Sequence, residues 1–287
     1  MPMKINEIDL YEYFGVKKPE NGVGILYSYI IDNSGEIDTG RKHPAMLVIP
    51  GGGYSMTSDR EAEPVALAYI ANNFNSFVLR YSCSPVRHPY QLAEAIMAMN
   101  YIRLNADKLS VDPDMVAAVG FSAGGHLCAM LGSIPDDDGA AEIFKSKVTA
   151  RPNAIVLGYP VITSGKKAHQ WSFMELCGKE NEELIKKLDI TNLVDKNSAP
   201  AFIWSTNTDN AVPCRNALLA ALAYDEAEVP FSLHVWGKGE HGLSLANACV
   251  YGSEAYKRAI NGMTQSVKEW VDLSIEWLAE NGVRVKI

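Results

Sequence analysis

Short runs rich in Val, Ile and aromatic residues recur along the chain, and segments with helical periodicity separate several of them. Many of these runs are apolar at consecutive positions, which is typical of strands covered on both faces. Strands that alternate with helices predict a mostly parallel central sheet with helices on both faces, a three-layer α/β/α fold. The predicted strands are GILYSYII near residue 25, residues 45–50, 76–82, 115–120, 154–160, 201–206 and 231–236, with the N-terminal KINEIDLYEY as a candidate first strand.

Two connecting segments carry apolar stripes at three- and four-residue spacing, which predicts helices. The first covers residues 89–109, and the second covers residues 263–280, where Asn281 and Gly282 favour a helix end. We interpret both stripes as core-facing. They consist of Leu92, Ile96, Met99 and Ile102 in the first segment and of Met263, Val267, Trp270, Val271 and Leu278 in the second.

No repeat, low-complexity tract or Pro- and Ser-rich linker divides the chain, so residues 1–287 are interpreted as a single α/β domain. The least regular interval is residues 161–198, with one polar helix predicted near residues 179–188. This interval either covers an active site or is a plain surface excursion.

Composition limits the partners that the protein can have. Hydrophobic residues make up 47% of the 287 positions, and 34 acidic against 26 basic side chains give a net charge of −8. We expect no nucleic-acid partner, because phosphate binding needs clustered Lys and Arg. We expect no membrane span either, because no apolar stretch approaches the roughly 20 residues required. The apolar content fits a monomer or a homodimer.

The cysteines and the N-terminal segment predict a cytoplasmic protein. The five cysteines are scattered and odd in number, with neither metal-site spacing nor the pattern of a disulfide framework. The N-terminal MPMKINEIDLYEYFG lacks the apolar core of a signal peptide. No bound metal and no organic cofactor are expected.

A candidate nucleophile, Ser122, lies in the stretch AVGFSAGGHLCAM between Gly120 and Gly124. Gly-x-Ser-x-Gly alone is weak evidence, because small residues recur wherever a strand turns sharply into a helix. Here a predicted strand precedes the motif and a helix-like run follows it, which is the context of a nucleophile elbow. Such an elbow strains the serine backbone, exposes its hydroxyl and leaves the next N–H, that of Ala123, free at a helix N-terminus.

A serine nucleophile needs a base to activate it. Among six histidines, His241 has the best position, because GKGEHGLSL is a Gly-rich loop directly after the strand at 231–236. His234 lies inside that strand and is interpreted as a sheet residue, and His126, on the helix after the elbow, is assigned to structure. His169 lies in the irregular interval, where we favour a surface position over contact with substrate.

The base in turn needs an orienting acid. Asp209, in STNTDNAVP, follows the strand at 201–206 directly and is our choice. Glu240 and Asp225 are competitors, although a carboxylate adjacent in sequence to the histidine usually cannot reach its ring.

A glycine run, Gly51 to Gly53 in VIPGGGYSM, follows the third strand. Consecutive glycines let backbone N–H groups turn toward a substrate oxygen, and together with the Ala123 N–H they would stabilise an oxyanion. A phosphate-binding loop is the alternative, but the Gly-x-Gly-x-x-Gly pattern of dinucleotide sites is absent. A plain Gly-rich turn is the other alternative.

These pieces together resemble the α/β-hydrolase superfamily, whose triads follow the chain order Ser, Asp, His. Within it, PGGGY, GFSAGGHL, YPVIT, TDNAVP and GEHGLSLA are similar to bacterial carbohydrate acetyl esterases and sugar hydrolases of the acetyl-xylan-esterase and hormone-sensitive-lipase-like type. The resemblance implies Ser122 as nucleophile, His241 as base and then acid, and Asp209 as orienter. It also implies the N–H groups of Gly52, Gly53 and Ala123 as the oxyanion hole.

One departure from the lipase pattern concerns the residue before the glycines. Lipases of this type have a His there, whereas this chain has Pro50, so the glycine loop must be supported differently.

We expect a serine carboxylesterase that acts on short-chain, acetyl-type esters of a carbohydrate or another small polar alcohol. Two alternatives stay open. One is a peptidase, amidase or formamidase with the same triad, and the other is a non-catalytic binding protein on a hydrolase fold.

Overall fold

The computed structural model describes residues 3–284, whose strands form one eight-stranded sheet. The strand order is β1-β2-β4-β3-β5-β6-β7-β8, in which the pairs β1–β2 and β2–β4 are antiparallel and the other pairs are parallel. This mostly parallel sheet confirms the predicted fold class. The strands are β1 (Lys4–Asp9), β2 (Ile25–Ile30), β3 (His43–Ile49), β4 (Asn75–Arg80), β5 (Val111–Phe121), β6 (Ile155–Gly158), β7 (Ala201–Thr206) and β8 (Phe231–Trp236).

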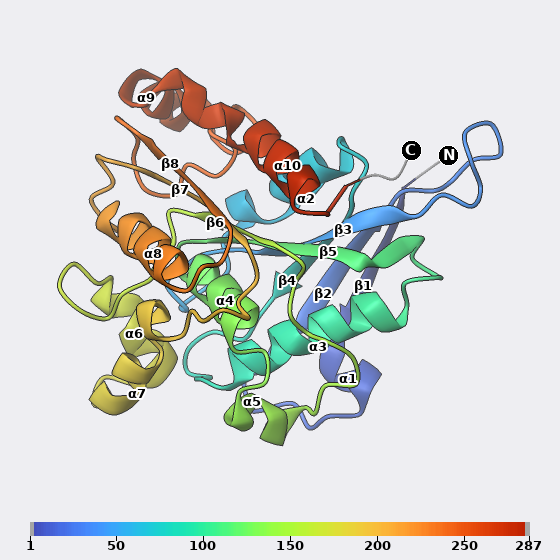
Figure 1. Cartoon of the computed structure of the whole chain (residues 1–287), viewed down its shortest axis with the longest axis horizontal. Coiled ribbons are helices and arrows are strands. Elements are labelled where there is room, and N and C mark those ends of the chain that lie inside the picture. Colours follow the sequence, from blue (N-terminus) through green and yellow to red (C-terminus); the bar gives the residue numbers. More distant parts are fainter. Residues whose placement is uncertain (1–2, 285–287) are drawn as a thin grey trace.

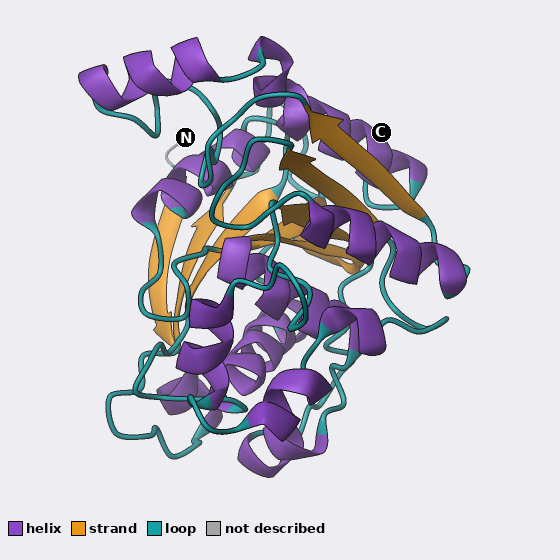
Figure 2. Ribbon diagram, turned by 90° about the vertical axis from the view of Figure 1, so that its left-hand side faces the viewer, coloured by secondary structure: helices purple, strands orange, loops and turns teal. Residues whose placement is uncertain are grey.

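Helices cover both faces of the twisted sheet (Figures 1 and 2). Successive residues of a strand point to opposite faces, so Ala45 and Leu47 of β3 enter one core while Met46 and Val48 enter the other. The first core includes residues of α3 (Tyr90–Leu104), α4 (Ser122–Ser133) and α8 (Arg215–Glu226). The second includes residues of α2 (Glu63–Ile70) and α10 (Trp270–Glu280).

The remaining described elements surround this framework, with α1 and α5 beside α3 and with α9 on the opposite side of the sheet, near α10 (Figure 1). They are α1 (Leu10–Phe14), α5 (Asp138–Ile143), α6 (Gln170–Cys177), α7 (Glu182–Lys187), α9 (Ser253–Gly262) and the 3₁₀ helices η1 (Asp59–Glu61), η2 (Ile190–Asn192) and η3 (Gln265–Glu269).

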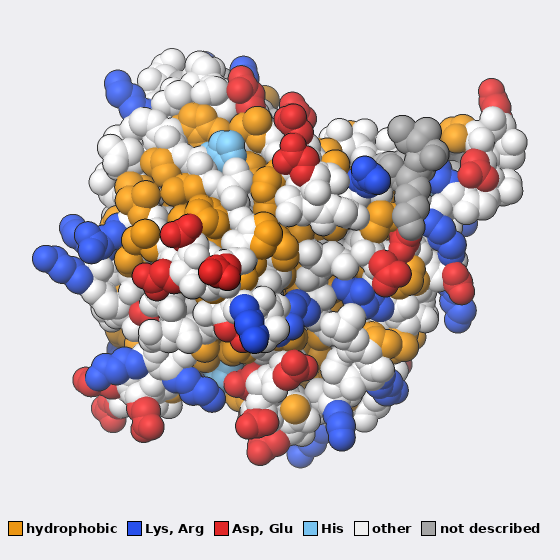
Figure 3. Space-filling view, viewed as in Figure 1, with side chains coloured by type: hydrophobic (Ala, Val, Ile, Leu, Met, Phe, Trp, Pro, Cys, Tyr) orange, Lys and Arg blue, Asp and Glu red, His pale blue; other side chains and the backbone are white. Residues whose placement is uncertain are grey.

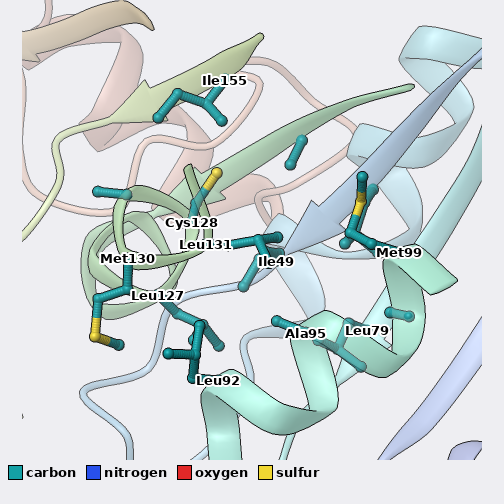
Figure 4. Close-up of a cluster of buried hydrophobic side chains, with 14 of the residues drawn as sticks. Ile49, Leu79, Leu92, Ala95, Met99, Leu127, Cys128, Met130, Leu131 and Ile155 are labelled. Atoms are coloured by element: carbon teal, nitrogen blue, oxygen red, sulfur yellow. The ribbon is translucent and has the colours of Figure 1, made fainter. Parts of the chain in front are cut away.

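The core beneath the candidate serine is built by α3 and α4 packing against the sheet. Figure 4 shows side chains of both helices grouped with side chains of β3, β4 and β6. Helix α3 is buried on nearly every side from Gln91 to Asn100. This core holds α4, and therefore the start of that helix, at a fixed place over the sheet. The grouped residues include Leu92, Ala95 and Met99 of α3, Leu127, Cys128 and Leu131 of α4, and Ile49, Leu79 and Ile155 of the strands.

The two predicted helical stripes are buried, as expected, but both helices are shorter than predicted. Helix α3 ends at Leu104, because Asn105 turns its side chain back and donates to the carbonyl of Tyr101 (2.8 Å). The C-terminal segment starts as the 3₁₀ helix η3 before α10 begins at Trp270. The candidate first strand is split in the same way, since β1 ends at Asp9, whose carboxylate caps α1.

The irregular interval, residues 161–198, holds more structure than the sequence indicated. The polar helix predicted near 179–188 is α7, but α6 precedes it and was not predicted. Helix α6 buries Phe173, Leu176 and Cys177, which lie at three- and four-residue spacing. That short stripe is the signal from which α6 could have been found.

Charged side chains of both signs are interspersed over the face seen in Figure 3. Hydrophobic side chains gather over α8 and β8, where Leu218, Leu222 and Val235 are exposed. Among the described helices, none combines the length and the apolar composition that crossing a bilayer requires.

A buried carboxyl group, that of Glu94 in α3, joins three elements on the β2 side of the sheet. Its Oε1 accepts hydrogen bonds from the hydroxyls of Tyr11 (2.7 Å) and Ser82, and its Oε2 accepts the Ser82 N–H (2.6 Å). Burial raises the pKa of Glu94 to about 7, and the three donors offset this only in part. The charged form is therefore disfavoured in the folded chain.

We expect Glu94→Gln to change how the free energy of unfolding depends on pH. The pKa of this carboxyl rises from 4.5 to about 7 on folding, so its contribution to stability is complete below about pH 4.5 and is lost as the pH rises to about 7. Over that interval wild type should lose about 3 kcal/mol relative to the variant. Urea unfolding of both proteins across this range measures the difference, and parallel pH profiles would contradict it.

Candidate active site

The candidate nucleophile lies at the junction of β5 and α4, since β5 ends at Phe121 and α4 begins at Ser122. The φ angle of Ser122 is 52°, in the left-handed region that side-chain-bearing residues rarely adopt. Backbone strain is therefore stored at the serine itself. The strained strand-turn-helix geometry expected from the sequence is present.

Close packing of α4 against β5 at Gly120, and against the end of β3 at Gly124, makes this turn possible. A Cβ atom on Gly124 would lie 2.2 Å from the carbonyl oxygen of Ile49 and 2.3 Å from that of Pro50. A Cβ atom on Gly120 would lie 2.3 Å from the carbonyl oxygen of Gly124. Any side chain would force the helix away from the strand and shift the serine between them.

The imidazole of His241 reaches Ser122 from the loop after β8, with Nε2 2.9 Å from Oγ. That loop is fastened to the end of β7, because the hydroxyls of Thr206 and Thr208 both donate to the carbonyl of Gly239 (2.9 and 3.0 Å). The ring position thus depends on two neighbouring parallel strands.

Asp209, in the loop after β7, meets the other side of the imidazole. Its Oδ2 lies 2.6 Å from Nδ1 of His241, and its Oδ1 accepts the N–H groups of Ala211 and Val212 (2.9 Å each). The carboxylate side chain is fully buried. Both ring nitrogens of His241 are occupied by Ser122 and Asp209, which leaves none for the competitors considered from the sequence, Glu240 and Asp225.

This chain of hydrogen bonds fixes the direction in which a proton can move. A carboxylate only accepts, so Nδ1 of His241 carries the ring proton and Nε2 is left to accept the hydroxyl proton of Ser122. A hydroxyl bonded to such a base can attack an electrophilic carbon while it loses its proton, and the buried carboxylate of Asp209 stabilises the resulting imidazolium. The arrangement is suited to acyl transfer.

The glycine loop after β3 faces the same cavity. Gly52 and Gly53 have φ angles of 130° and 66°, and a Cβ atom on Gly52 would lie 2.2 Å from the carbonyl oxygen of Met56. Within residues 3–284, no hydrogen-bond acceptor is found for either N–H. Ala123 is buried in the first turn of α4, where helical N–H groups have no partner within the helix.

Two buried tyrosines support the glycine loop. The hydroxyl of Tyr81 donates to the carbonyl of Pro50 (2.8 Å), and that of Tyr54 lies 2.8 Å from Nδ1 of His126. Since Nε2 of His126 donates to the carbonyl of Leu188 (2.8 Å), Nδ1 accepts from Tyr54. Burial lowers the pKa of His126 to about 4, which keeps the ring neutral. His126 is structural, as expected.

A cavity of about 400 Å³ joins these groups at the carboxyl ends of the parallel strands. Its walls bring together the candidate nucleophile, the candidate base and the glycine loop, together with side chains from η1 and from residues 161–198. The lining residues are Gly52, Gly53, Met56, Ser58, Arg60, Glu61, Ser122, His169, Trp171, His241 and Gly242.

The surface position expected for His169 is wrong, because α6 turns this segment toward the glycine loop. His169 is half-buried and lines the cavity, with Nδ1 2.8 Å from the hydroxyl of Ser172. Burial, and after it the nearby His241, lower the pKa of His169. Trp171, which sequence reasoning did not select, also lines the cavity and donates from Nε1 to the hydroxyl of Ser55 (2.8 Å).

The sheet position expected for His234 is confirmed, since its ring stacks on Phe202 with centroids 4.7 Å apart. Over the described range 3–284, no three His, Cys, Asp or Glu side chains are grouped so that they could hold a metal ion.

Comparison with known proteins places the chain in a family. The family model described as BD-FAE matches residues 36–222. The chain is 36% identical over 211 residues to endo-1,4-beta-xylanase B of Butyrivibrio fibrisolvens, over 72% of this chain and 33% of the xylanase. It is 27% identical over 248 residues to the acetylxylan esterase of Xylanibacter ruminicola, over 84% of this chain and 48% of the esterase. The chain thus spans a third to about half of the length of these relatives.

A solved structure extends the likeness to the whole fold. The acetyl ester-xyloside bifunctional hydrolase from Caldicellulosiruptor lactoaceticus superposes with a TM-score of 0.77 at 35% identity, over 91% of this chain and 89% of that chain. The chain therefore belongs to the BD-FAE family, and it has the α/β-hydrolase fold.

Proposed function

We propose that this chain is a serine carboxylic ester hydrolase that removes acetyl or similarly small acyl groups from a carbohydrate or another small polar alcohol. The observation that carries the proposal is the hydrogen-bonded chain from Ser122 through His241 to Asp209 at the edge of a cavity. The names of the relatives, an acetylxylan esterase and an acetyl ester-xyloside hydrolase, support an ester as the reacting bond and a sugar as the alcohol.

In the first half of the reaction, Oγ of Ser122 attacks the ester carbonyl while Nε2 of His241 takes the hydroxyl proton. The carbonyl oxygen becomes an oxyanion as the C–O bond to Ser122 forms. When the tetrahedral intermediate collapses, the bond to the alcohol breaks and His241 returns its proton to the leaving oxygen. The acyl group stays on Ser122 as an ester.

In the second half, water replaces the alcohol. His241 takes a proton from water as its oxygen attacks the acyl carbon, and it then returns that proton to Oγ of Ser122 as the acid leaves. Asp209 keeps the imidazole oriented in both halves and stabilises its charged form. The groups are therefore restored after each turnover.

Backbone N–H groups of Gly52, Gly53 and Ala123 are assigned to the oxyanion. Removing one such donor in a hydrolase costs roughly 3 kcal/mol of transition-state stabilisation. The N–H groups of Gly52 and Gly53 suit this role because they have no acceptor among the described residues.

The cavity walls support a small polar alcohol. Trp171 keeps 51% of its surface exposed while its Nε1 is held by Ser55, so an indole face is presented in a fixed orientation. The C–H face of a sugar ring can pack on such a surface, and the half-buried imidazole of His169 beside it can hydrogen-bond to sugar hydroxyls. We assign both side chains to binding the sugar.

Replacing the nucleophile should abolish the reaction. We expect Ser122→Ala to lower kcat for acetyl esters by at least about 10³-fold and to prevent labelling by a fluorophosphonate probe, measured by intact-mass analysis. The matched control is Ser133→Ala at the other end of α4, which should be labelled and should keep its activity. Equal labelling of wild type and Ser122→Ala would contradict the proposal.

Removing the indole of Trp171 should raise KM for sugar esters and leave KM for other esters nearly unchanged. For Trp171→Ala we expect KM for an acetylated oligosaccharide to rise about three- to tenfold, the loss anticipated for one aromatic face. KM for nitrophenyl acetate, which has no sugar ring, should change little, and Trp171→Phe should restore most of the loss. Steady-state kinetics on the two substrates measure both KM values. An equal change in KM for both substrates would contradict stacking of the sugar on Trp171.

A further inference from the structure

A buried carboxylate lies between the two loops that carry the proposed reaction. Glu61 ends the 3₁₀ helix η1, is only 3% exposed and contributes to the cavity wall. Burying a carboxylate is costly unless other groups compensate its charge. No ion pair within residues 3–284 includes Glu61, and its described partners are neutral hydrogen-bond donors from two separate loops.

The first partner is the glycine loop. The N–H of Gly51 donates to Oε2 of Glu61 (2.8 Å). A Cβ atom on Gly51 would lie 2.8 Å from this oxygen and 2.9 Å from Cβ of Ser122, so a glycine is what lets carboxylate and nucleophile approach this closely. Because Glu61 occupies the N–H of Gly51, the next two N–H groups, those of Gly52 and Gly53, are the ones left to face a substrate.

The second partner leads to the histidine loop. The hydroxyl of Tyr159 donates to Oε1 of Glu61 (2.6 Å) and accepts the N–H of Ser244 (2.9 Å), three residues beyond His241. The ring of Tyr159 also packs edgewise against the imidazole of His241, with centroids 5.0 Å apart. Burial raises the pKa of Tyr159 well above its usual value, so the hydroxyl keeps the proton that it donates.

Further hydrogen bonds join the segment around Glu61 to the histidine loop. The hydroxyl of Ser244 donates to the backbone carbonyl of Arg60 (2.6 Å), and the guanidinium of Arg60 donates to the carbonyl of Gly242 (3.0 Å). Residues 60 and 61 thus hold the histidine loop on both sides of Leu243, while the carboxylate of Glu61 also binds the glycine loop.

We propose that Glu61 is a positioning residue that couples the glycine loop to the histidine loop through Gly51 and Tyr159. The inference rests on the proposed esterase function, because it concerns the relative placement of the oxyanion donors and the base. A displacement of about 1 Å in such a site can cost 10²-fold in rate. Pro50 stands where the lipase pattern has a His before its glycines, so the glycine loop needs a different support. In this account Glu61 supplies that support.

The kinetic test is Glu61→Gln, which keeps the volume of the side chain but cannot accept at both positions. We expect kcat to fall about 10- to 100-fold, with KM changed by less than about threefold, as for an interaction that strengthens in the transition state. Tyr159→Phe, which keeps the ring but lacks the hydroxyl, should cause a similar loss. The double variant should lose less than the product of the two single effects, because both remove one connection.

Glu94→Gln is the matched control, since it neutralises an equally buried glutamate outside the cavity. It should keep the kcat of wild type. Wild-type kcat in Glu61→Gln would overturn the proposal, as would fully multiplicative effects in the double variant.

A second measurement does not depend on turnover. Glu61→Gln should speed backbone amide exchange in residues 50–58 and 240–246 together, whereas Glu94→Gln should leave both segments unchanged. Faster exchange throughout the core would indicate a purely structural role and would contradict the proposal, as would a change in only one loop.

If wild type cleaves no ester yet the two loops respond together, the coupling stands and the proposed function fails. If wild type is active and Glu61→Gln behaves like it in both measurements, the coupling fails alone.

Discussion

The close crossing of β5 and α4 is the constraint on which the rest of the site depends. Gly120 lets α4 approach β5, and Gly124 lets it approach the end of β3, to distances that admit no side chain. The chain between the two glycines then turns at Ser122 with φ at 52°. Strain of this kind persists only when the surroundings determine it fully. Here α3 and α4 pack as a buried layer against the sheet and hold the turn in place.

Parallel strands bring the other groups to the same edge. The glycine loop, the serine, the aspartate and the histidine follow β3, β5, β7 and β8, so residues separated by up to 190 positions meet around one cavity. Hydrogen bonds between loops then fix the details. Glu61 and Tyr159 connect the glycine loop to the histidine loop, and Tyr54 and His126 connect the glycine loop to α4 and to residues 161–198.

The sequence predicted the parts of the site that follow strands directly. Ser122, Asp209 and His241 each lie a few residues beyond an apolar run, and the structure joins them by hydrogen bonds of 2.9 and 2.6 Å. Glu61 was not singled out, because in SDREAEP it looks like one of several solvated acids, and its burial comes from residues far away in the chain. His169 was misplaced for a related reason, since the missed helix α6 directs it into the cavity.

The central claim is that Ser122 carries the acyl group between the two halves of the reaction. The most direct measurement is rapid quenching of wild type with nitrophenyl acetate, a substrate whose good leaving group lets the acyl-enzyme accumulate. Mass analysis of the quenched protein should show one added acetyl group on the peptide that contains Ser122, and nitrophenol should appear in an initial burst. Steady turnover with no burst and no acetyl group on Ser122 would contradict the account.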